Sequence, residues 1–430
     1  MKKELRVGIA GLGNVGAGVV KLIQKHGRAL EQRAGCKFNI IAVSARSKKK
    51  ARAIDVSQYQ WVNDPLDLVN NPDIDVIVEL IGGASGMAYE LVVAALSAGK
   101  HVVTANKALL AHHGHTLAML AEKQNVGLFF EGSVAGGIPA IKALREGFAA
   151  NQVDSVRGIL NGTCNYILTE MRETGRDFAA VLKEAQAKGY AEADPSFDVD
   201  GIDTAHKLSI LTALAFGTPP DIEQMEISGI RHITAADINH AKELGYRIKL
   251  LGSCRRVGKN IIQSVEPCLV PEQGALGAVN GVLNAVHVVG DFVGAGLLVG
   301  RGAGEGPTAS AVVADLMDIA RGHQLPVFGI PARRMKAGNF ASADILNAHF
   351  YMHVVVRDQP GVLAQISAIL RDHKISVEAV IQRGRDPGKP VSIVMTTHLV
   401  KQSDMRKAVE KIGKMKLTQG KPCVMRIEEE

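Results

Sequence analysis

The sequence predicts an α/β protein of three domains: a doubly wound parallel sheet, an α+β domain and a C-terminal unit with the β-α-β-β-α-β order of a ferredoxin-like fold. Three observations support this prediction. The chain has 430 residues, more than one hydrophobic core of about 250 to 300 residues usually serves. Its first third alternates apolar strand patterns with helical patterns. Its last part shows strand and helix patterns in the order β-α-β-β-α-β.

The first domain is expected over residues 1–135. Apolar runs that read as strands alternate there with segments of helical periodicity. Strands that are apolar throughout imply a parallel sheet covered by helices on both faces. The strand patterns are LRVGIA, FNIIAVSA, DVIVELIG, KHVVTA and VGLFFEG.

An α+β domain for catalysis and dimerisation is expected over residues 136–310, and the small C-terminal unit over residues 348–430. The helical segment near residues 311–340, which contains AVVADLMDIARGH, is expected to return to the first domain. In the second domain VDSVRGILNGTCNYIL, ISGIRHIT, KLLGSCRRV and IIQSVEPCLV read as strands. In the third, HFYMHVVVRD, SVEAVIQRG, PVSIVMTTHL and CVMRIE read as strands around two helices.

Composition excludes several classes of function. The net charge of +7 is spread along the chain, so the basic stripe of a nucleic-acid-binding protein is absent and a small acidic ligand is favoured. The five cysteines are scattered and include no CxxC pair, which argues against a disulfide framework or a zinc site and favours a reducing cytoplasm. The most apolar late stretch is interrupted by His287 and Asp291, so no run reaches the ~20 residues of a membrane span.

The first motif is VGIAGLGNVG, in which Gly11, Gly13 and Gly16 form G-x-G-x-x-G between a strand and a helix. Gly11 permits the tight turn, Gly13 lets a pyrophosphate approach the backbone, and Gly16 allows close helix packing. The helix N-terminus faces the phosphates. This context predicts a Rossmann dinucleotide-binding site, with Asn14 and Val15 in the same loop.

The second strand indicates which dinucleotide is preferred. It ends near Ser44, where NAD-preferring proteins usually offer a carboxylate to the ribose hydroxyls. This chain offers Arg46, followed by Ser47 and Lys48. Because a guanidinium suits a 2′-phosphate, NADP(H) is favoured, and NAD(H) is the second choice.

Two loops after later strands are also expected to bind ligands. Ala105 and Lys107 follow the carboxyl end of KHVVTA, the edge at which open α/β sheets bind ligands. A lysine at a helix start is mildly unfavourable, so contact with an anionic ligand or the nicotinamide region explains Lys107. In EGSVAGGIPAI, Glu131 and backbone carbonyls suit a hard cation, and a glycine-rich loop without an ion explains the pattern equally well.

Carboxylates and one lysine gather in KGYAEADPSFDVDGIDTAHK, ahead of an apolar helix. Capping uses only one or two of them. Asp203 and Lys207 are four residues apart and therefore share a helical face. An exposed pair contributes only a few tenths of a kcal/mol, and the other residues of this helix favour burial, so the pair predicts an active-site cleft. The full set is Glu192, Asp194, Asp198, Asp200, Asp203 and Lys207.

A competing nucleophile is Cys164 in LNGTCNYIL. Thiol-dependent aldehyde dehydrogenases also combine a Rossmann domain with an α+β domain, and they use an activated thiolate at a helix start. A small packing residue is the commoner role of such a cysteine. His206 reads as local packing or as a hydrogen-bond partner.

The motifs VGIAGLGNVG, VVTANKALLA, EGSVAGGIP, ILNGTCNYIL, KGYAEADPSFDVDGIDTAHKL and GRGAGEGPTASAVVADL together resemble the homoserine dehydrogenase family over roughly residues 4–340. The tail, with VVVRDQPGVLAQI, looks like an ACT domain. The resemblance implies NAD(P)H-dependent reduction of L-aspartate 4-semialdehyde to L-homoserine, in threonine, methionine and isoleucine biosynthesis. The alternatives are a semialdehyde dehydrogenase that uses Cys164 and a non-catalytic nucleotide or amino-acid sensor.

The resemblance also implies residue roles. Lys207 corresponds to the catalytic acid/base, Asp203 to a carboxylate that positions the lysine and binds substrate, and Glu192 and Asp198 to the substrate-binding acidic run. Gly189 borders the nicotinamide. The remaining cofactor-binding positions are Gly83, Ala105, Lys107 and Gly304.

Further partners follow from the same resemblance. Glu131, with the carbonyls of Val134, Gly136 and Ile138, corresponds to a structural sodium site, which favours the ion over an empty loop. The ACT domain implies an amino-acid effector, with threonine as the family expectation. ACT-like sheets commonly pair between subunits, so a homo-oligomer is expected.

Overall fold

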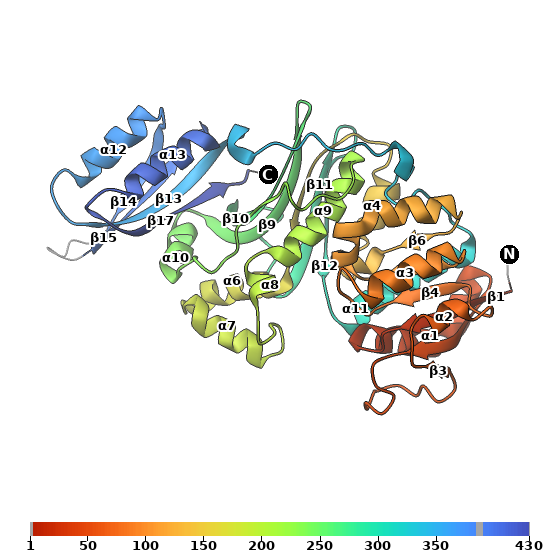
Figure 1. Ribbon diagram of the computed structural model, residues 1–430. Helices are drawn as coiled ribbons and strands as arrows, with labels where there is room; N and C mark the ends of the chain where they lie inside the picture. The colour runs from red at the N-terminus through yellow and green to blue at the C-terminus, as the bar shows by residue number, and fades with distance from the viewer. Residues whose placement is uncertain (1–2, 384–389, 430) are drawn as a thin grey trace.

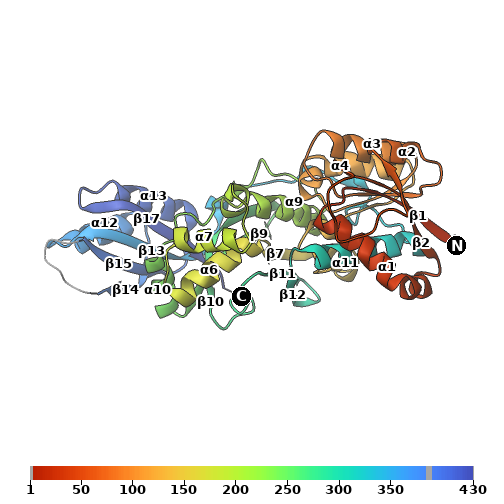
Figure 2. The same ribbon diagram turned by 90° about the horizontal axis from the view of Figure 1, so that it is seen from below.

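The computed structural model of the protein describes residues 3–383 and 390–429. Three parts lie in a row, with the N-terminal domain at one end and the C-terminal unit at the other (Figures 1 and 2). The predicted fold class is confirmed: a parallel sheet, a mixed α/β middle part and a ferredoxin-like end. Within the described ranges, no helix is long and apolar enough to cross a membrane.

The N-terminal sheet has six strands in the order β3-β2-β1-β4-β5-β6, and all neighbours are parallel. Five of them match the apolar patterns of the sequence. The missed strand, β3, has only three residues that are half-buried or exposed, too few for a pattern. The strands are β1 (Glu4–Ala10), β2 (Lys37–Ser44), β3 (Gln60–Val62), β4 (Val76–Glu79), β5 (His101–Thr104) and β6 (Leu128–Phe129).

Helices cover both faces of this sheet. One face packs against α1 (Asn14–Ala34) and α11 (Glu305–Arg321), and Lys21 Nζ on α1 lies 2.6 Å from Glu305 Oε1 on α11. The other face packs against α3 (Met87–Ser97) and α4 (Lys107–Lys123). A short helix, α2 (Asp67–Asn70), lies beside α3 on this second face and buries Leu68 in the same core.

The segment near residues 311–340 is helical over only part of its length. Its α-helix, α11, ends at Arg321, and the rest holds one short 3-10 turn, η3 (Ala332–Arg334). That turn lies against α4, where the Ala332 amide donates to Glu122 Oε2 at 2.8 Å. The helix and the turn thus both contact the N-terminal domain.

The middle sheet is antiparallel, in the order β12-β11-β7-β9-β10, with the short strand β8 pairing to β10 in parallel. Two strand predictions are wrong here. VDSVRGILNGTCNYIL is a strand only to Ile159 and then becomes a helix, and ISGIRHIT is a loop after Ile227. The strands are β7 (Val153–Ile159), β8 (Glu226–Ile227), β9 (Tyr246–Val257), β10 (Asn260–Pro271), β11 (Leu283–Gly290) and β12 (Gly294–Arg301).

The middle helices pack against this sheet and against one another. The central one, α9 (Ile202–Phe216), is buried continuously from Asp203 to Ala213 and contacts α4 of the N-terminal domain. Figure 1 shows α9 beside the middle sheet on the side of α4. The others are α5 (Ala140–Lys142), α6 (Gly162–Thr174), α7 (Phe178–Ala187), α8 (Ser196–Val199) and α10 (Ala235–Glu243), with the short turns η1 (Glu131–Ser133) and η2 (Ala143–Gly147).

The C-terminal unit has the sheet order β17-β13-β15-β14, as expected for a ferredoxin-like fold. Its last strand also pairs in parallel with β10, through Cys268 with Arg426 and Leu269 with Ile427. The middle and C-terminal sheets are therefore one continuous sheet. The elements are η4 (Ala343–Ile345), β13 (Asn347–Arg357), α12 (Val362–Asp372), β14 (Val377–Gln382), β15 (Pro390–Thr397), β16 (Val400–Lys401), α13 (Gln402–Gly413) and β17 (Thr418–Ile427).

Candidate active site

The first two turns of α9 hold the pair that the sequence singled out. Lys207 Nζ donates to Asp203 Oδ2 at 2.7 Å and to the carbonyl of Leu160 at 2.7 Å. Asp203 is 3% exposed and Lys207 is 8% exposed. A buried pair of this kind is not a surface bridge. An ammonium has three N–H donors, and residues 3–383 and 390–429 offer Lys207 only these two hydrogen-bond acceptors, so one donor remains for another acceptor.

A second lysine joins the pair from the N-terminal domain. Lys107, the first residue of α4, places its Nζ 3.1 Å from Asp203 Oδ1. Burial favours the neutral form of Asp203, but Lys207 and Lys107 outweigh it and hold the pKa of this carboxyl well below its usual value. Asp203 is therefore ionised between two ammonium groups that come from two domains.

Asn161 completes the cluster and was not predicted. It is the N-cap of α6, where its Oδ1 accepts from the Cys164 amide at 2.8 Å. Its Nδ2 donates to Asp203 Oδ2 at 2.9 Å and to Asp198 Oδ1 at 2.8 Å. The signal was present, because Asn is a preferred N-cap, but reading NGTCNYIL as a strand hid it.

The other acidic residues divide into two groups. Burial raises the pKa of Asp198, which faces the cluster through Asn161. Asp194 caps the Ser196 amide at 3.0 Å, and Asp200 is paired with Arg231, so both have structural roles. Glu192 is exposed between α7 and α8, and no contact among the described residues joins its carboxylate to Asp203 or Lys207.

Cys164 and His206 lie beside the cluster in packing roles. The Cys164 thiol is buried and donates to the Asp198 carbonyl at 3.3 Å, and burial raises its pKa well above the usual value. Such a thiol is not an activated thiolate. His206 packs edge-on against His112 and Phe197, and burial lowers its pKa to about 4, so it is neutral at physiological pH.

The glycine loop after β1 has the geometry of a dinucleotide site. Gly11 has φ +103°, and a Cβ there would lie 2.4 Å from the Leu80 carbonyl oxygen. A Cβ on Gly16 would lie 2.0 Å from the Gly11 carbonyl oxygen. Gly13, by contrast, is the N-cap of α1 and has no atom within 4 Å of its Cβ position. This open space in front of a helix N-terminus fits a pyrophosphate, and Asn14 and Val15 begin that helix.

Two guanidinium groups lie near the end of β2. Arg46 is exposed two residues after the strand. Arg52, which was not singled out, donates to the carbonyls of Ser47 at 2.7 Å and Leu12 at 3.3 Å and lies over the Trp61 ring. Arg52 therefore ties the loop that carries Arg46 to the glycine loop.

The remaining cofactor candidates lie on loops of two domains. Gly83 and Ala105 follow strands of the N-terminal sheet, Gly304 precedes α11, and Gly189 lies in the middle domain. The Gly83 carbonyl accepts from Asn106 Nδ2 at 2.7 Å, beside half-buried Ala105. Gly304 has φ +114° and is the N-cap of α11. Gly189 has φ +72° and ends α7 in the middle domain.

Glu131 is buried in the loop expected to hold sodium. Its two carboxylate oxygens accept the amides of Ile141 at 3.0 Å and Lys142 at 2.9 Å, and burial raises its pKa to about 7. The Ile138 carbonyl accepts from Ala140 at 2.7 Å. Each of these oxygens has a second lone pair, so Glu131 and Ile138 fit a hard cation. Val134 and Gly136 lie buried in the same loop.

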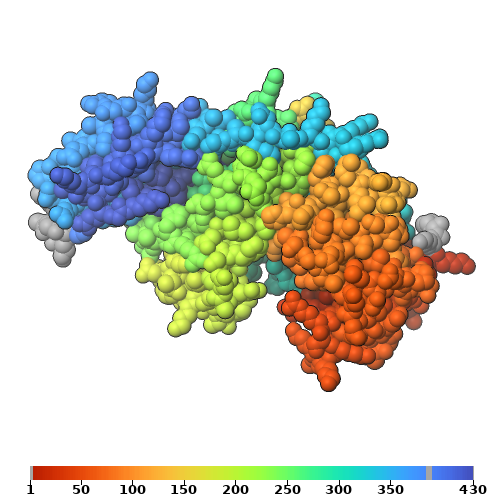
Figure 3. Space-filling model, viewed as in Figure 1, coloured from red at the N-terminus to blue at the C-terminus, as the bar shows by residue number. Residues whose placement is uncertain are grey.

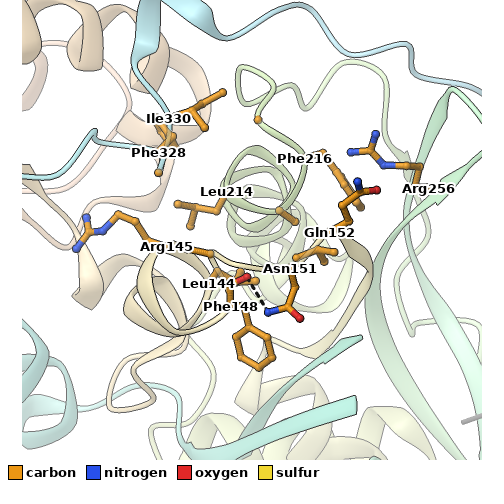
Figure 4. A pocket seen from close by; sticks show the side chains of 15 residues that line it. Leu144, Arg145, Phe148, Asn151, Gln152, Leu214, Phe216, Arg256, Phe328 and Ile330 are labelled. Atoms are coloured by element: carbon orange, nitrogen blue, oxygen red, sulfur yellow. Dashed lines mark hydrogen bonds between the residues drawn. The ribbon is translucent and has the colours of Figure 1, made fainter. Parts of the chain in front are cut away.

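The cluster lies where the N-terminal and middle domains meet. Figure 3 shows the surface hollowed between the orange N-terminal domain and the yellow-green middle domain. A separate cavity of about 410 Å³ lies at the opposite end of α9, lined by Leu214, Phe216, Arg145 and Arg256 among others (Figure 4). Asp203 and Lys207 do not line it, so this cavity is not part of the catalytic cluster.

Comparison with known proteins identifies the family. Residues 139–317 match the family Homoserine dehydrogenase, residues 11–131 match Homoserine dehydrogenase, NAD binding domain, and residues 353–416 match the ACT domain. The chain is 46% identical over 429 residues to the homoserine dehydrogenase of Neisseria gonorrhoeae, with 98% of each chain covered. The chain belongs to the homoserine dehydrogenase family.

Solved structures agree with the assignment to homoserine dehydrogenases. The crystal structure of a homoserine dehydrogenase from Thiobacillus denitrificans aligns with a TM-score of 0.94 at 42% identity, over 99% of both chains. A hyperthermophilic archaeal homoserine dehydrogenase in complex with NADPH aligns at 29% identity and a TM-score of 0.64, over 73% of this chain and 97% of its own. The protein is thus an NAD(P)-dependent oxidoreductase that acts on a CH–OH group, and neither alternative function is supported.

Proposed function

We propose that the cluster of Lys107, Asp203 and Lys207 is where this homoserine dehydrogenase reduces L-aspartate 4-semialdehyde to L-homoserine. One observation carries the assignment: Lys207 is buried, oriented by two acceptors and left with one free N–H donor. Bound NAD(P)H supplies the hydride that reaches the aldehyde carbon. The chain itself must then stabilise and protonate the oxygen on which negative charge develops.

Lys207 does this as a general acid. Its free N–H hydrogen-bonds the aldehyde oxygen, and its proton passes to that oxygen as the alkoxide forms. Asp203 holds the ammonium in place and, with Lys107, fixes the charge balance of the cluster. Glu192 and Asp198 bind the substrate ammonium. Because Glu192 lies exposed in a loop, that loop must approach the cluster when substrate binds.

Arg46 is proposed to select NADP(H) over NAD(H). Its exposed guanidinium follows β2, and Arg52 ties its loop to the glycine loop. A 2′-phosphate carries two negative charges that a guanidinium can bind through paired hydrogen bonds. Gly11, Gly13 and Gly16 bind the pyrophosphate, and Ala105, Gly83, Gly189 and Gly304 complete the cofactor site.

A structural sodium ion is proposed at Glu131, with the carbonyls of Val134, Gly136 and Ile138. The support is a buried carboxylate, since buried charges are usually paired or coordinate metals. Replacing sodium with a large organic cation should lower the unfolding temperature of the wild type. A Glu131→Gln variant should lose this dependence.

The decisive assay is oxidation of NADPH with L-aspartate 4-semialdehyde in the absence of phosphate. We expect turnover with homoserine as the product. A dehydrogenase that forms a thioester on Cys164 would need phosphate and would run the opposite redox reaction on this substrate. Turnover that depends on phosphate, or no turnover, would contradict the proposal.

Regulation, assembly and location are also proposed. An amino acid, with threonine as the first candidate, binds the ACT domain and acts on the catalytic domains from there. The chain forms a homo-oligomer and works in the cytoplasm, where its five free cysteines persist as thiols. Light scattering with and without threonine tests whether the chain forms a homo-oligomer and whether the effector acts on it.

A further inference from the structure

The turn between β7 and α6 touches both members of the catalytic pair. It consists of Leu160 and Asn161, which join the end of the strand to the start of the helix. The Leu160 carbonyl accepts from Lys207 Nζ at 2.7 Å. Asn161 Nδ2 donates to Asp203 Oδ2 at 2.9 Å, and the same oxygen accepts from Lys207 Nζ at 2.7 Å. Two successive residues of one turn therefore fix the lysine and its carboxylate.

The Asn161 side chain has a single orientation that satisfies its neighbours. It is 4% exposed, and its NH₂ group has two N–H donors. One donates to Asp203 Oδ2 and the other to Asp198 Oδ1 at 2.8 Å. Its oxygen accepts from the Cys164 amide at 2.8 Å. A flipped amide would turn this oxygen toward both carboxylates and leave the backbone N–H facing an NH₂ group.

Capping of α6 does not by itself explain the asparagine. An N-cap needs one side-chain oxygen, and Ser, Thr and Asp are also preferred at this position. Among these preferred caps, only the asparagine side chain also carries two N–H donors. These two donors are the part of Asn161 that contacts the catalytic cluster.

We propose that Asn161 is a positioning residue for the reduction, because its amide holds Asp198 and Asp203 beside each other as anions. Asp203 in turn orients Lys207, and Asp198 binds the substrate ammonium. The inference rests on the proposed function of this cluster. In this scheme Asn161 touches neither the substrate nor the cofactor and acts only through the two carboxylates and the turn that it caps.

Asp198 depends on this amide more than Asp203 does. Asp203 is also bonded to Lys207 and Lys107. The Asp198 carboxylate, by contrast, has Asn161 as its only hydrogen-bond donor within residues 3–383 and 390–429. In the same ranges its Oδ2 accepts no hydrogen bond, so this oxygen is left for the substrate ammonium.

The protonation of Asp198 gives the proposal a measurable consequence. Burial raises the pKa of this carboxyl, and the hydrogen bond from Asn161 opposes the rise because it favours the charged form. The other titratable groups that face it are Asp203 and Lys207 on α9, Lys107 on α4 and Cys164 on α6. Loss of the Asn161 donor should therefore raise the pKa of Asp198 further, and the anion that binds the ammonium would be lost at a higher pH.

The test compares two substitutions at Asn161 in the full-length chain, both of which keep a capping oxygen for α6. Asn161→Ser removes the two donors, and Asn161→Asp replaces them with a third carboxylate. In Asn161→Ser we expect kcat with NADPH and L-aspartate 4-semialdehyde to fall about 100-fold, the cost of a small misplacement of the reacting groups. KM for the semialdehyde should rise roughly 10-fold, because a charged partner of the substrate is weakened. The Kd of NADPH should stay unchanged.

The pH profile distinguishes positioning from a merely structural role. The acid limb of kcat/KM should move to higher pH in Asn161→Ser and farther in Asn161→Asp, where a like charge is added beside Asp198. Thr234→Ala is the control, because it removes the cap of α10, a helix outside the cluster. It should lower the unfolding temperature and leave both kcat and the acid limb in place.

The outcomes separate this inference from the proposed function. If the wild type turns over and Asn161→Ser keeps its kcat, its KM and its acid limb, Asn161 is only a cap and the inference is overturned. An acid limb that stays in place while kcat falls overturns it as well. If the space left by serine prevents folding, Asn161→Asp, which has nearly the same size, decides the question by the same profile. A wild type without any turnover would instead overturn the proposed function.

Discussion

Lys207 is the residue whose replacement should cost the most activity. In Lys207→Ala we expect kcat to fall by roughly two to four orders of magnitude, the usual contribution of a general acid. NADPH binding should be unchanged, because Lys207 lies on α9 and not on the glycine loop. Steady-state kinetics and fluorescence titration measure the two quantities. Lys183→Ala, an exposed lysine on α7, is the control, and near-normal turnover in Lys207→Ala would contradict the assignment.

Arg46 should separate the two dinucleotides. Arg46→Ala is expected to weaken NADPH binding far more than NADH binding, because only NADPH carries the 2′-phosphate that a guanidinium pairs with. The dissociation constants of both cofactors measure this, with Lys49→Ala, another exposed cation of the same loop, as the control. An equal effect on both cofactors would remove Arg46 from the phosphate site.

Cys164 should be dispensable for catalysis. Its buried thiol has a raised pKa and donates to a backbone carbonyl, and serine preserves that donor. Cys164→Ser should therefore keep most of the wild-type kcat in the same assay. Rapid inactivation of the wild type by a thiol reagent at Cys164 alone would revive the nucleophile hypothesis.

At the residue scale, the sequence predicted a site contact where both residues lie on one helix, because their spacing along the chain then shows that they are close. Asp203 and Lys207 share a helix turn, and their burial follows from the apolar residues around them. Asn161 could not be placed, because its two carboxylate partners lie about forty residues away in the chain. The pairing of Lys107 with Asp203 was missed for the same reason: it depends on how two domains dock.

Between elements, Asp203 joins the starts of α4, α6 and α9 through Lys107, Asn161 and Lys207. Asp203→Asn keeps the shape but leaves two ammonium groups without a counter-charge. Breaking a buried pair in this way costs about 3 to 5 kcal/mol. We expect the free energy of unfolding at pH 7 to fall by that amount in urea denaturation, while Asp177→Asn, an exposed position, should have little effect.

The difference in the free energy of unfolding between the wild type and Asp203→Asn should depend on pH in one direction. The pKa of Asp203 is lower in the folded protein than the ~3.9 of an unfolded chain. Its stabilising contribution is therefore complete above about pH 4 and is lost as the pH falls further, through the folded pKa. The gap between the wild type and Asp203→Asn should be constant from about pH 5 to 8 and shrink below about pH 4. A gap that changes between about pH 5 and 8 would point to another group.

At the scale of elements, the sequence predicted a helix or strand correctly where its apolar residues follow a single spacing along the whole element. The buried strands of the N-terminal sheet were found because each contains a run of mostly apolar residues, whereas β3 has only three residues. The hairpin of β11 and β12 was recognised only as an apolar stretch. In VDSVRGILNGTCNYIL the strand ends at Ile159 and the helix begins at Gly162, so close together that the spacing of apolar residues alone did not show the boundary at Asn161.

For the whole molecule, the order of the domains was predictable and their joining was not. The parallel pairing of β17 with β10 makes one sheet of two units. Arg426 on β17 is buried and pairs with Glu266 of β10 at 3.1 Å. These contacts join residues about 160 positions apart in the chain, and no local pattern reports them.

The C-terminal unit can be tested by ending the chain after Leu346. We expect this chain to keep catalysis, because the contacts within the catalytic cluster all fall between Lys107 and Lys207. It should lose any inhibition by threonine. We propose that the effector's carboxylate binds at the Pro360–Gly361 turn, where backbone amides and the N-terminus of α12 meet, and this turn is gone. It should also unfold at a lower temperature, because the edge of β10 is uncovered and Asp237 loses its partners Tyr351 and His353.

A milder variant separates lost regulation from lost stability. Gly361 has φ +89° and no atom within 4 Å of its Cβ position, so Gly361→Val strains the turn and fills the open space in front of α12 without a clash inside the fold. In the full-length chain this variant should reduce threonine inhibition while β17 stays paired with β10. Calorimetric titration of the wild type with threonine and related amino acids tests whether the C-terminal unit binds an amino acid at all. If none of them binds, the C-terminal unit serves only assembly, and its continuous sheet with the middle domain is then its whole contribution.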